Sequence, residues 1–394
     1  MLQSINLEKY QDQDFPPVMS SLIPENENSI FLEGINKEKL AKLRSCVQWM
    51  KIEKFYNTKN IQLFIKNEGV TPVEEITQGK LSNSYLTAAV ASLLTSKPEL
   101  IREMFETSAL NSQGVIAIRM LVQGEPSLIL CDENFPVCIG KRKKAAFLNS
   151  KGKEIWVAAL EKAWTKINGK CYAKTCLATP YEAFNSLVFA PTYFYYHKKY
   201  ISRNSTHLVW NKLLDAKAKG YAICTNIEEN TEALEFLSEN PENHSFTGNQ
   251  TNNQSNINLN VEISSAISNN ANASFYNNQA FAVVEIYEFE DLKLMKIWNP
   301  KGKNKDWSGE YAHNSENWSR ELLVNVKYKK APGVFFATFE EYFKHFAWTY
   351  ICKNENNFIY RSIKSRVYCS NKPYNNEDRD GEEFKEEAKK EGNS

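Results

Sequence analysis

The stretch from residue 76 to residue 94, ITQGKLSNSYLTAAVASLL, constrains the fold of this chain more than any other segment. A polar loop, QGKLSNS, leads directly into an apolar run, YLTAAVASLL, which has the composition of a buried helix. We expect this helix to form the spine of a lobe, since an apolar helix is stable only where other elements cover it. The loop also delivers a small side chain, Ser84, to the start of the helix, which is how several hydrolases present a nucleophile.

The remaining composition is that of a globular protein. The 394 residues suffice for two or three compact units with their own cores. A net charge of +1 gives no sign of binding to nucleic acid or to an anionic membrane, and we interpret the basic run KRKK at 141–144 as a solvated loop. No apolar run approaches the ~20 residues of a membrane span, and the N-terminus lacks the pattern of a signal peptide. We therefore expect a cytoplasmic protein.

The cysteines give no sign of a metal centre. All eight are scattered along the chain without CxxC pairs or Cys/His clusters. This spacing argues against a zinc site, and reduced thiols are the expectation for a protein of the cytosol.

Hydrophobic periodicity separates a helical first half from a strand-rich second half. Helices are expected at 37–44, from the opening motif to about Phe105, and at 153–169, where apolar residues share one face and Asn168-Gly169 ends the helix. Two strands joined by a Gly-Glu-Pro turn are expected between 114 and 137, and further strands at 219–227, 278–289, 292–300 and 333–339. This segregation predicts an α+β protein with two lobes.

The same segments predict four regions. They are an N-terminal arm and entry to the core at 1–45, a helical first lobe at 46–190, a β-rich second lobe at 191–353 and a charged tail at 354–394. A segment dense in Asn, Ser and Gln, 239–278, is expected to be a flexible insertion in the second lobe. The end of the tail lacks apolar anchors, so we expect it to be disordered or a marginal solvated helix.

Four motifs, in order along the chain, resemble the catalytic core of the calpain-type cysteine proteases over about residues 10–353. They are QGKLSNSY with LTAA, EIWVAALEKAWTKINGKCY, NNQAFAVVEIYEF with KIWNPKGKNKDWSGEY and SENW, and GVFFATFEEYFKHF. The family patterns similar to them are Q-G-x-L-G-D-C-W, E-F-W-x-x-L-L-E-K-A-Y-A-K-x-N-G, G-H-A-Y-S-V with R-N-P-W-G, and D-G-x-F-W-M-x-F. The resemblance implies a papain-like fold of two lobes, with a helical first lobe and an antiparallel β-rich second lobe.

The resemblance also assigns the positions of a catalytic site. A papain-like protease needs a thiolate nucleophile, a histidine base, an asparagine that orients the base and a glutamine that helps to hold the oxyanion. By resemblance these roles fall on Ser84, Gln279, Asn299 and Gln78, so the nucleophile and the base are replaced. A serine hydroxyl is a poor nucleophile without a base, and an amide takes up no proton near neutral pH. We therefore expect a degenerate triad with no functional catalytic residue.

No other histidine is expected to serve as the base. None of the five histidines lies in the strand that should present it, so each is interpreted as an exposed or hydrogen-bonded residue. Calpain cores also bind calcium, and the resemblance makes Glu75 and Glu161 candidate ligands. Calcium takes six to eight oxygens, so two carboxylates are too few for a site, and we interpret both as solvated or helix-surface charges. No other cofactor is expected.

Three hypotheses for the function follow. The first is a calpain-like pseudoprotease that binds protein partners or has a structural role; the resemblance implies a place in the cytoskeleton or a cilium, where divergent calpain-like proteins are often found. The second is an active endopeptidase or other hydrolase that uses Ser84 with an unrecognised base. The third is a calcium-responsive module without catalysis. A titratable group within hydrogen-bond reach of the Ser84 hydroxyl would favour the second.

Overall fold

The computed structural model describes residues 9–25, 37–55, 61–64, 72–140, 144–150, 154–176, 178–227, 279–302 and 307–355. The chain divides into two units, Met1–Phe358 and Ile359–Ser394, and every described residue belongs to the first. The Asn-rich segment, the charged end of the tail and most of the KRKK run lie outside the described residues. No helix within the described ranges is long and apolar enough to cross a membrane.

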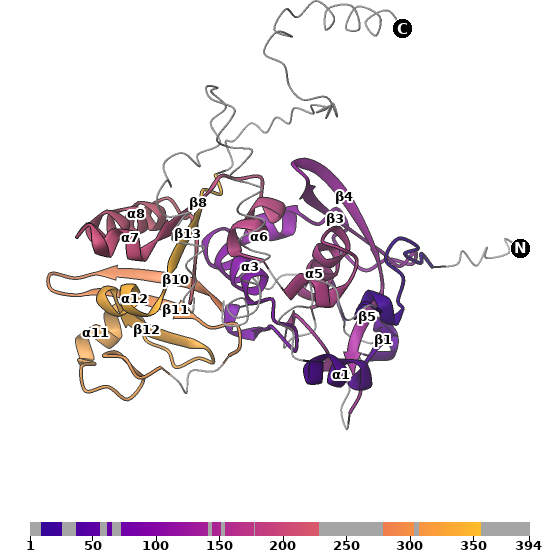
Figure 1. The fold of residues 1–394 in the computed structure, drawn as a ribbon, viewed down its shortest axis with the longest axis horizontal. Helices are drawn as coiled ribbons and strands as arrows, with labels where there is room; N and C mark the ends of the chain where they lie inside the picture. Colours follow the sequence, from indigo (N-terminus) through magenta and orange to yellow (C-terminus); the bar gives the residue numbers. More distant parts are fainter. Residues whose placement is uncertain are drawn as a thin grey trace, which may run out of the picture. The chain divides into compact units, whose positions relative to one another are not determined.

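The first half of the described chain combines helices with small antiparallel sheets (Figure 1). The helices are α1 (Lys37–Cys46), α2 (Ile52–Phe55), α3 (Ser84–Ser96), α4 (Pro98–Glu103), α5 (Trp156–Ile167) and α6 (Pro180–Leu187), with 3₁₀ turns at Met19–Ser21, Val73–Glu75 and Tyr172–Cys176. The sheets pair β1 (Val47–Lys51) with β5 (Asn134–Cys138) and β5 with β6 (Lys144–Ala145), β2 (Ile76–Thr77) with β7 (Asn149–Ser150), and β3 (Val115–Val122) with β4 (Glu125–Asp132).

The second half is built on a six-stranded antiparallel sheet with the order β12-β11-β10-β9-β13-β8. Its strands are β8 (Thr192–Tyr196), β9 (Ala222–Asn226), β10 (Ala280–Glu288), β11 (Lys293–Trp298), β12 (Val334–Thr338) and β13 (Trp348–Cys352), and its helices are α7 (His197–Ser202), α8 (Thr206–Ala218), α11 (Arg320–Asn325) and α12 (Phe339–His345). One side of the sheet packs with α8 and α12 in a hydrophobic cluster that includes Trp210, Phe281 and Tyr342. The predicted α+β class with antiparallel sheets is confirmed.

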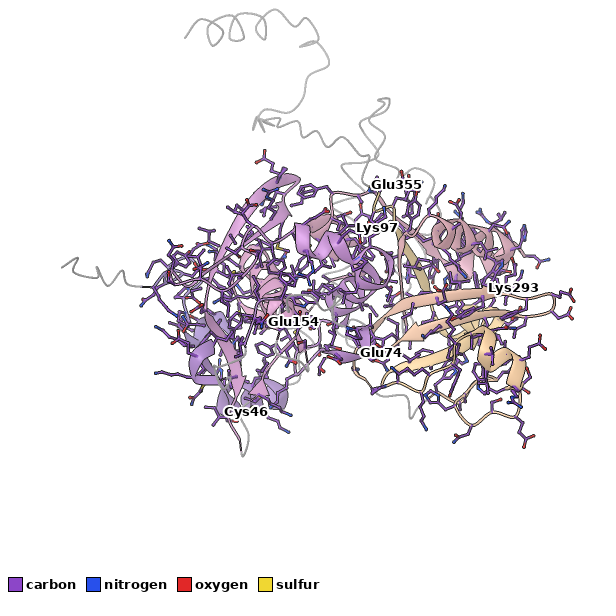
Figure 2. The ribbon with its side chains drawn as sticks, turned by 180° about the vertical axis from the view of Figure 1, so that it is seen from behind. Cys46, Glu74, Lys97, Glu154, Lys293 and Glu355 are labelled. Atoms are coloured by element: carbon purple, nitrogen blue, oxygen red, sulfur yellow. The ribbon has the colours of Figure 1, made fainter. Side chains whose placement is uncertain are left out.

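Helix α3 packs against the sheet through a face of small side chains. Ser84, Ala88 and Ser92 are four residues apart and therefore lie on one face of the helix. The Oγ of Ser92 lies 3.4 Å from the Sγ of Cys224 in β9. At the other end of α3, the ammonium of Lys97 donates to the carbonyl of Asn354, just after β13, at 2.6 Å (Figure 2). The helix is thus joined along its length to the second half of the chain.

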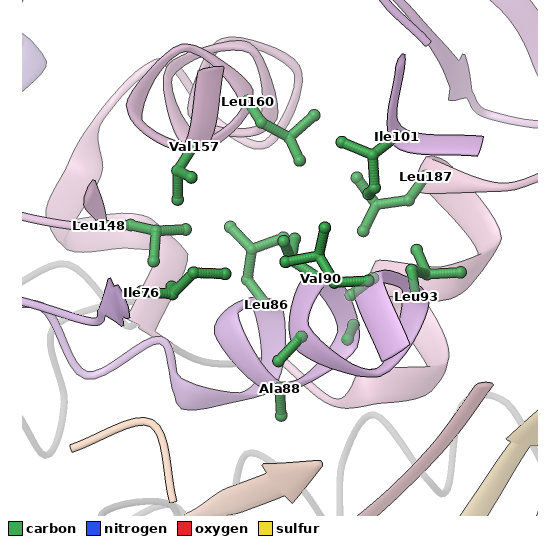
Figure 3. Packing of buried hydrophobic residues seen from close by; sticks show 14 of the residues in the cluster. Ile76, Leu86, Ala88, Val90, Leu93, Ile101, Leu148, Val157, Leu160 and Leu187 are labelled. Carbon is green, nitrogen blue, oxygen red and sulfur yellow. The ribbon is translucent and has the colours of Figure 1, made fainter. Parts of the chain in front are cut away.

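The other faces of α3 carry larger side chains into the core of the first half. Figure 3 shows Leu86 and Val90 directed toward Leu160 of α5, with Leu187 of α6 beside them and Ala88 pointing away toward the strands. All residues from Ser84 to Leu94 are buried. The helix is therefore covered on every side, as its apolar sequence requires.

Several details of the fold differ from the prediction, and helix α8 and strand β1 were not expected. The turn between β3 and β4 lies at Gln123-Gly124, which have positive φ angles of 51° and 80°, because Glu125 already pairs with Val122 in the ladder. The predicted strands also omit β8 and β13, which pair with each other although they lie far apart in the sequence. Strand β13 lies inside the sheet between β9 and β8 and is buried throughout, so it lacks the alternation of buried and exposed positions that marks a half-exposed strand.

A buried ion pair connects α5 to β4 and to the N-terminal arm. Helix α5 has the predicted apolar face, but it also buries Lys162, whose ammonium donates to the Asp132 carboxylate and, at 2.7 Å, to the carbonyl of Asn134. Both side chains of the pair are 0% exposed. The backbone N–H of Asp12, in the arm, donates to the second Asp132 oxygen at 3.1 Å. One carboxylate therefore organises three segments that are distant in the sequence.

Breaking this pair should be costly. Lys162→Met would leave the Asp132 carboxylate buried without its cation, and we expect a loss of about 3–5 kcal/mol in the free energy of unfolding, measured with urea. The control is Arg119→Met, which removes the exposed ion pair with Glu106 and should cost less than about 1 kcal/mol. Equal losses in the two variants would contradict the assigned role of Lys162.

Candidate active site

The loop before α3 is held against a neighbouring chain segment by close backbone contact. Gly79 has a φ of +76°, and a Cβ at this position would lie 2.4 Å from the carbonyl oxygen of Phe147. The N–H of Lys80 donates to the carbonyl of Ala146 at 2.9 Å. Only glycine satisfies both the positive φ and this approach, so position 79 of the motif is a structural requirement.

Gln78, the predicted oxyanion donor, uses its amide inside the loop. Its Nε2 donates to the carbonyl of Leu81 at 2.6 Å, and the side chain is buried. Its Oε1 is also buried and has no hydrogen-bond partner among the described residues. The bond to a carbonyl fixes the amide orientation, because the reverse orientation would place two acceptors against each other.

The tertiary structure brings the three predicted triad positions together. The N–H of Ala280, which follows Gln279, donates to the Oγ of Ser84 at 3.0 Å, although the two residues are 196 positions apart. The Nε2 of Gln279 donates to the Oδ1 of Asn299 at 2.6 Å. The same oxygen accepts the backbone N–H of Lys301 at 3.0 Å. Gln279 and Asn299, the positions predicted for the base and for the residue that orients it, are thus hydrogen-bonded to each other.

These contacts are hydrogen bonds between groups that hold their protons. Ser84 is buried, and Ala280 supplies the hydrogen bond to its hydroxyl within the described part of the chain. Neither the Gln279 amide nor the Asn299 amide can accept a proton from that hydroxyl near neutral pH. The arrangement can orient groups and can bind through hydrogen bonds, but its amides cannot act as a general base.

The described histidines do not replace the base. His197 is buried; its Nδ1 bonds the carbonyl of Phe346 at 2.7 Å and its Nε2 bonds the Oγ1 of Thr349 at 2.8 Å. Burial lowers the pKa of His197 to about 3, so it stays neutral. His313 bonds the hydroxyl of Tyr328 at 2.6 Å, and the two remaining described histidines are exposed. This agrees with the predicted roles, while His244 lies outside the described residues.

The two calcium candidates have different surroundings. Glu75 is exposed, whereas Glu161 is 1% exposed, so the interpretation of Glu161 as a surface charge is wrong. One Glu161 oxygen accepts from the Nδ2 of Asn83 at 2.6 Å and the other from the N–H of Leu148 at 3.0 Å. No group of three or more His, Cys, Asp or Glu side chains suited to a metal ion occurs in the described ranges. Both Glu161 oxygens are already used within the protein.

Glu161 and Asn83 are the site residues whose roles the sequence did not indicate. Their hydrogen bond ties helix α5 to the residue before Ser84. Glu161 directly follows the apolar position Leu160, so helical periodicity alone places it at the edge of the buried face. Burial raises the pKa of Glu161 from its ordinary value of 4.5 to about 8, against the opposing effect of its two hydrogen bonds.

In a papain-like cysteine protease core, the first residue of a buried helix faces the start of an antiparallel strand, beside an asparagine that follows the next strand, and Ser84, Ala280 and Asn299 have this arrangement. A sequence model of the family described as calpain family cysteine protease matches residues 10–353, which is most of the chain. The protein therefore belongs to the calpain family of cysteine proteases.

Individual relatives are distant in sequence. The chain is 23% identical to the calpain-type cysteine protease ADL1 of Oryza sativa subsp. japonica over 358 residues, which cover 87% of this chain and 14% of that protein. It is 24% identical to the calpain-2 catalytic subunit of Bos taurus over 288 residues, which cover 71% of this chain and 35% of that protein. The chain thus corresponds to a limited part of each relative.

The buried carboxyl group should make stability depend on pH. Glu161 is protonated in the folded protein up to about pH 8 but ionises near pH 4.5 when unfolded, so its contribution to stability falls as pH rises through this window. We expect Glu161→Gln to gain stability relative to the wild type by roughly 1.4 kcal/mol for each pH unit within the window, measured by urea denaturation.

Glu75→Gln is the control for this prediction, because Glu75 is an exposed glutamate close to the same loop. An equal pH dependence in Glu75→Gln would show that the effect of Glu161→Gln does not come from the burial of its carboxyl group. A Glu161→Gln difference that is constant between about pH 5 and pH 8 would show that the buried carboxyl is ionised throughout.

Proposed function

We propose that this protein is a calpain-like pseudoprotease that acts by binding other proteins and not by cutting them. The observation that carries the proposal is the hydrogen bond from Gln279 to Asn299. The predicted position of the base thus holds an amide, which does not titrate near neutral pH. The backbone N–H of Ala280, the residue after Gln279, donates to the hydroxyl of Ser84. This hydrogen bond occupies one of the two lone pairs of the hydroxyl oxygen and supplies no group that could take up its proton.

The energetic argument rests on losing the nucleophile and the base together. Removal of triad groups in serine proteases costs on the order of 10⁶-fold in kcat. The rate acceleration that is left over the uncatalysed reaction comes from the oxyanion site and from substrate binding. In this chain the oxyanion position, Gln78, also bonds its own loop. What survives is the framework: Trp307 donates to the carbonyl of Phe336 at 2.7 Å, and Gly79 keeps its close approach. A core that keeps these contacts but has no catalytic base is suited to binding a protein without cutting it.

The proposal extends to the kind of partner. Divergent calpain-like proteins are often cytoskeletal or ciliary, so we propose protein partners in such an assembly. The binding role requires neither Ser84 as a nucleophile nor a metal ion. Two regions are candidates for the partner contact: the segment 239–278, which lies outside the described residues, and the surface of the core. The partner experiment below distinguishes between them.

A serine-directed fluorophosphonate probe tests the absence of catalysis. We expect the wild-type protein to remain unlabelled, because the Ser84 hydroxyl has an amide and not a base beside it. Ser92→Ala is the matched control, since Ser92 is a buried hydroxyl on the same helix face. Labelling that persists in Ser92→Ala and disappears in Ser84→Ala, together with cleavage of a peptide library, would establish the alternative of an active hydrolase.

Affinity purification from the native cell, followed by mass spectrometry, tests the binding role. We expect the wild type and Ser84→Ala to retain the same partners, uncleaved, because binding does not use the hydroxyl as a nucleophile. Partners that appear as fragments with the wild type and intact with Ser84→Ala would contradict the proposal. A variant without 239–278 then shows whether this segment or the core surface makes the contact.

A further inference from the structure

A lysine in the candidate-site loop lies against a cysteine from another part of the fold. The ammonium of Lys80 donates to the Sγ of Cys46 at 2.9 Å. Lys80 belongs to the loop between Gln78 and Ser84, and Cys46, labelled in Figure 2, is the last residue of α1, where the chain enters β1. The contact places an amine nitrogen beside an oxidisable sulfur, and no role assigned to the candidate site uses it.

Backbone hydrogen bonds hold both residues of this pair in place. The N–H of Lys80 donates to the carbonyl of Ala146 at 2.9 Å, and the N–H of Ala146 donates in turn to the carbonyl of Pro136 in β5 at 3.0 Å. The carbonyl of Cys46 accepts from the N–H of Ile139, just after β5, at 2.8 Å. Both main chains are therefore fixed to the same strand, and the nitrogen meets the sulfur without a rearrangement of the fold.

The pair is accessible to a small reagent. Cys46 and Lys80 are both partly exposed. Cys138, at the end of β5, is only 6% exposed, and burial raises the pKa of its thiol against the opposing effect of Lys80. The ammonium thus acts on a second sulfur as well, but the direct hydrogen bond and the greater exposure both select Cys46 as its partner.

We propose that Lys80 and Cys46 form a redox-controlled covalent crosslink, in which one oxygen atom bridges Nζ and Sγ. The oxidant is hydrogen peroxide. An inserted oxygen suits this contact, because an N–O and an S–O single bond at a bent oxygen span slightly less than the present separation of the two atoms. A direct N–S bond would require a much closer approach. The crosslink joins the loop that carries Ser84 to the junction of α1 with β1.

The reaction consumes two molecules of peroxide in balanced steps. The Cys46 sulfur attacks a peroxide oxygen, the S–O bond forms, the O–O bond breaks, and the departing hydroxide leaves as water with the thiol proton; the product is a sulfenic acid. The Lys80 ammonium releases a proton to solvent, and its nitrogen attacks a second peroxide in the same way, which gives a hydroxylamine and water. The hydroxylamine oxygen then attacks the sulfenic sulfur, a new S–O bond replaces the old one, and a third water leaves.

The sulfur is oxidised before the nitrogen. The hydrogen bond to Cys46 raises the pKa of Lys80, so the nitrogen keeps its proton while the thiol is reduced. Formation of the sulfenic acid changes this partner and frees the amine to react. Over the whole sequence the amine and the thiol lose four electrons, and each peroxide takes up two.

The crosslink would restrain the loop before α3. In the reduced protein the Lys80 side chain is tied to Cys46 by a hydrogen bond to sulfur, which is a weak acceptor. A covalent bridge closes the chain between positions 46 and 80 into a ring and lowers the entropy of the unfolded state, as a disulfide does. We therefore expect the melting temperature to rise on oxidation and to return to its original value with a thiol reductant.

Peptide mapping of the peroxide-treated full-length chain tests the proposal. We expect the intact mass to gain one oxygen and to lose two hydrogens, and a non-reduced map to join the peptide of Lys80 to that of Cys46. Excess dithiothreitol should release both peptides with their original masses. Cys46→Ser and Lys80→Arg should each lose the crosslink. Lys80→Arg keeps the charge but not the amine, so its Cys46 should stop at a sulfenic acid that dimedone captures.

Lys42→Arg is the matched control, because Lys42 is an exposed lysine one helical turn before Cys46 on α1. This variant should form the crosslink as the wild type does. Melting temperatures in reducing buffer show which variants fold, and the wild-type map alone decides the pairing if a variant does not.

Three outcomes would overturn the proposal. They are a disulfide of Cys46 with Cys138, which removes two hydrogens and adds no oxygen, a crosslink from Cys46 to Lys42, and oxidation of Cys46 that leaves Lys80 unmodified. None of the variants alters the predicted triad positions, so these results are independent of those that test the proposed function.

Discussion

The burial of helix α3 is the constraint on which the rest of the structure depends. Every residue from Ser84 to Leu94 is buried, so each face of the helix must contact another element. The face with Ser84, Ala88 and Ser92 has only small side chains and can approach the sheet closely, while larger residues fill the space toward α5 and α6. This approach places the first residue of the helix beside the first N–H of β10. The candidate site therefore follows from how the core packs.

The loop before α3 is fixed by groups that have no part in bond cleavage. Gly79 lies against the Phe147 backbone, Gln78 bonds the carbonyl of Leu81, and Asn83 bonds the buried carboxyl of Glu161. The buried pair of Lys162 with Asp132 fixes α5, which carries Glu161. The architecture of the site is thus maintained without a thiol at position 84 or an imidazole at position 279.

Sequence patterns predicted the elements that carry a clear local signal, such as an apolar helix face or an apolar run bounded by turn residues. The helices at 37–44 and 153–169 and the strands at 219–227, 278–289, 292–300 and 333–339 all have matching elements in the structure. Strands β8 and β13 were missed because neither is stable alone: each is a strand only through pairing with a segment distant in the sequence. The burial of Glu161 was missed for a similar reason. A carboxyl can be buried there only because Asn83 and the Leu148 N–H supply its hydrogen bonds.

The sequence by itself determined the class of the protein and the residue types at its key positions. The motifs around Ser84, Gln279 and Asn299 predicted a calpain-type core, and the chemistry of serine and glutamine follows from their side chains alone. Only the tertiary structure decided which groups meet. The bond of Ser84 to the Ala280 N–H and the contact of Lys80 with Cys46 join distant segments, and their geometry is set by packing of α3 and by strand register. Hydrogen bonds act over about 3 Å, so these partners become visible only when the chain is folded.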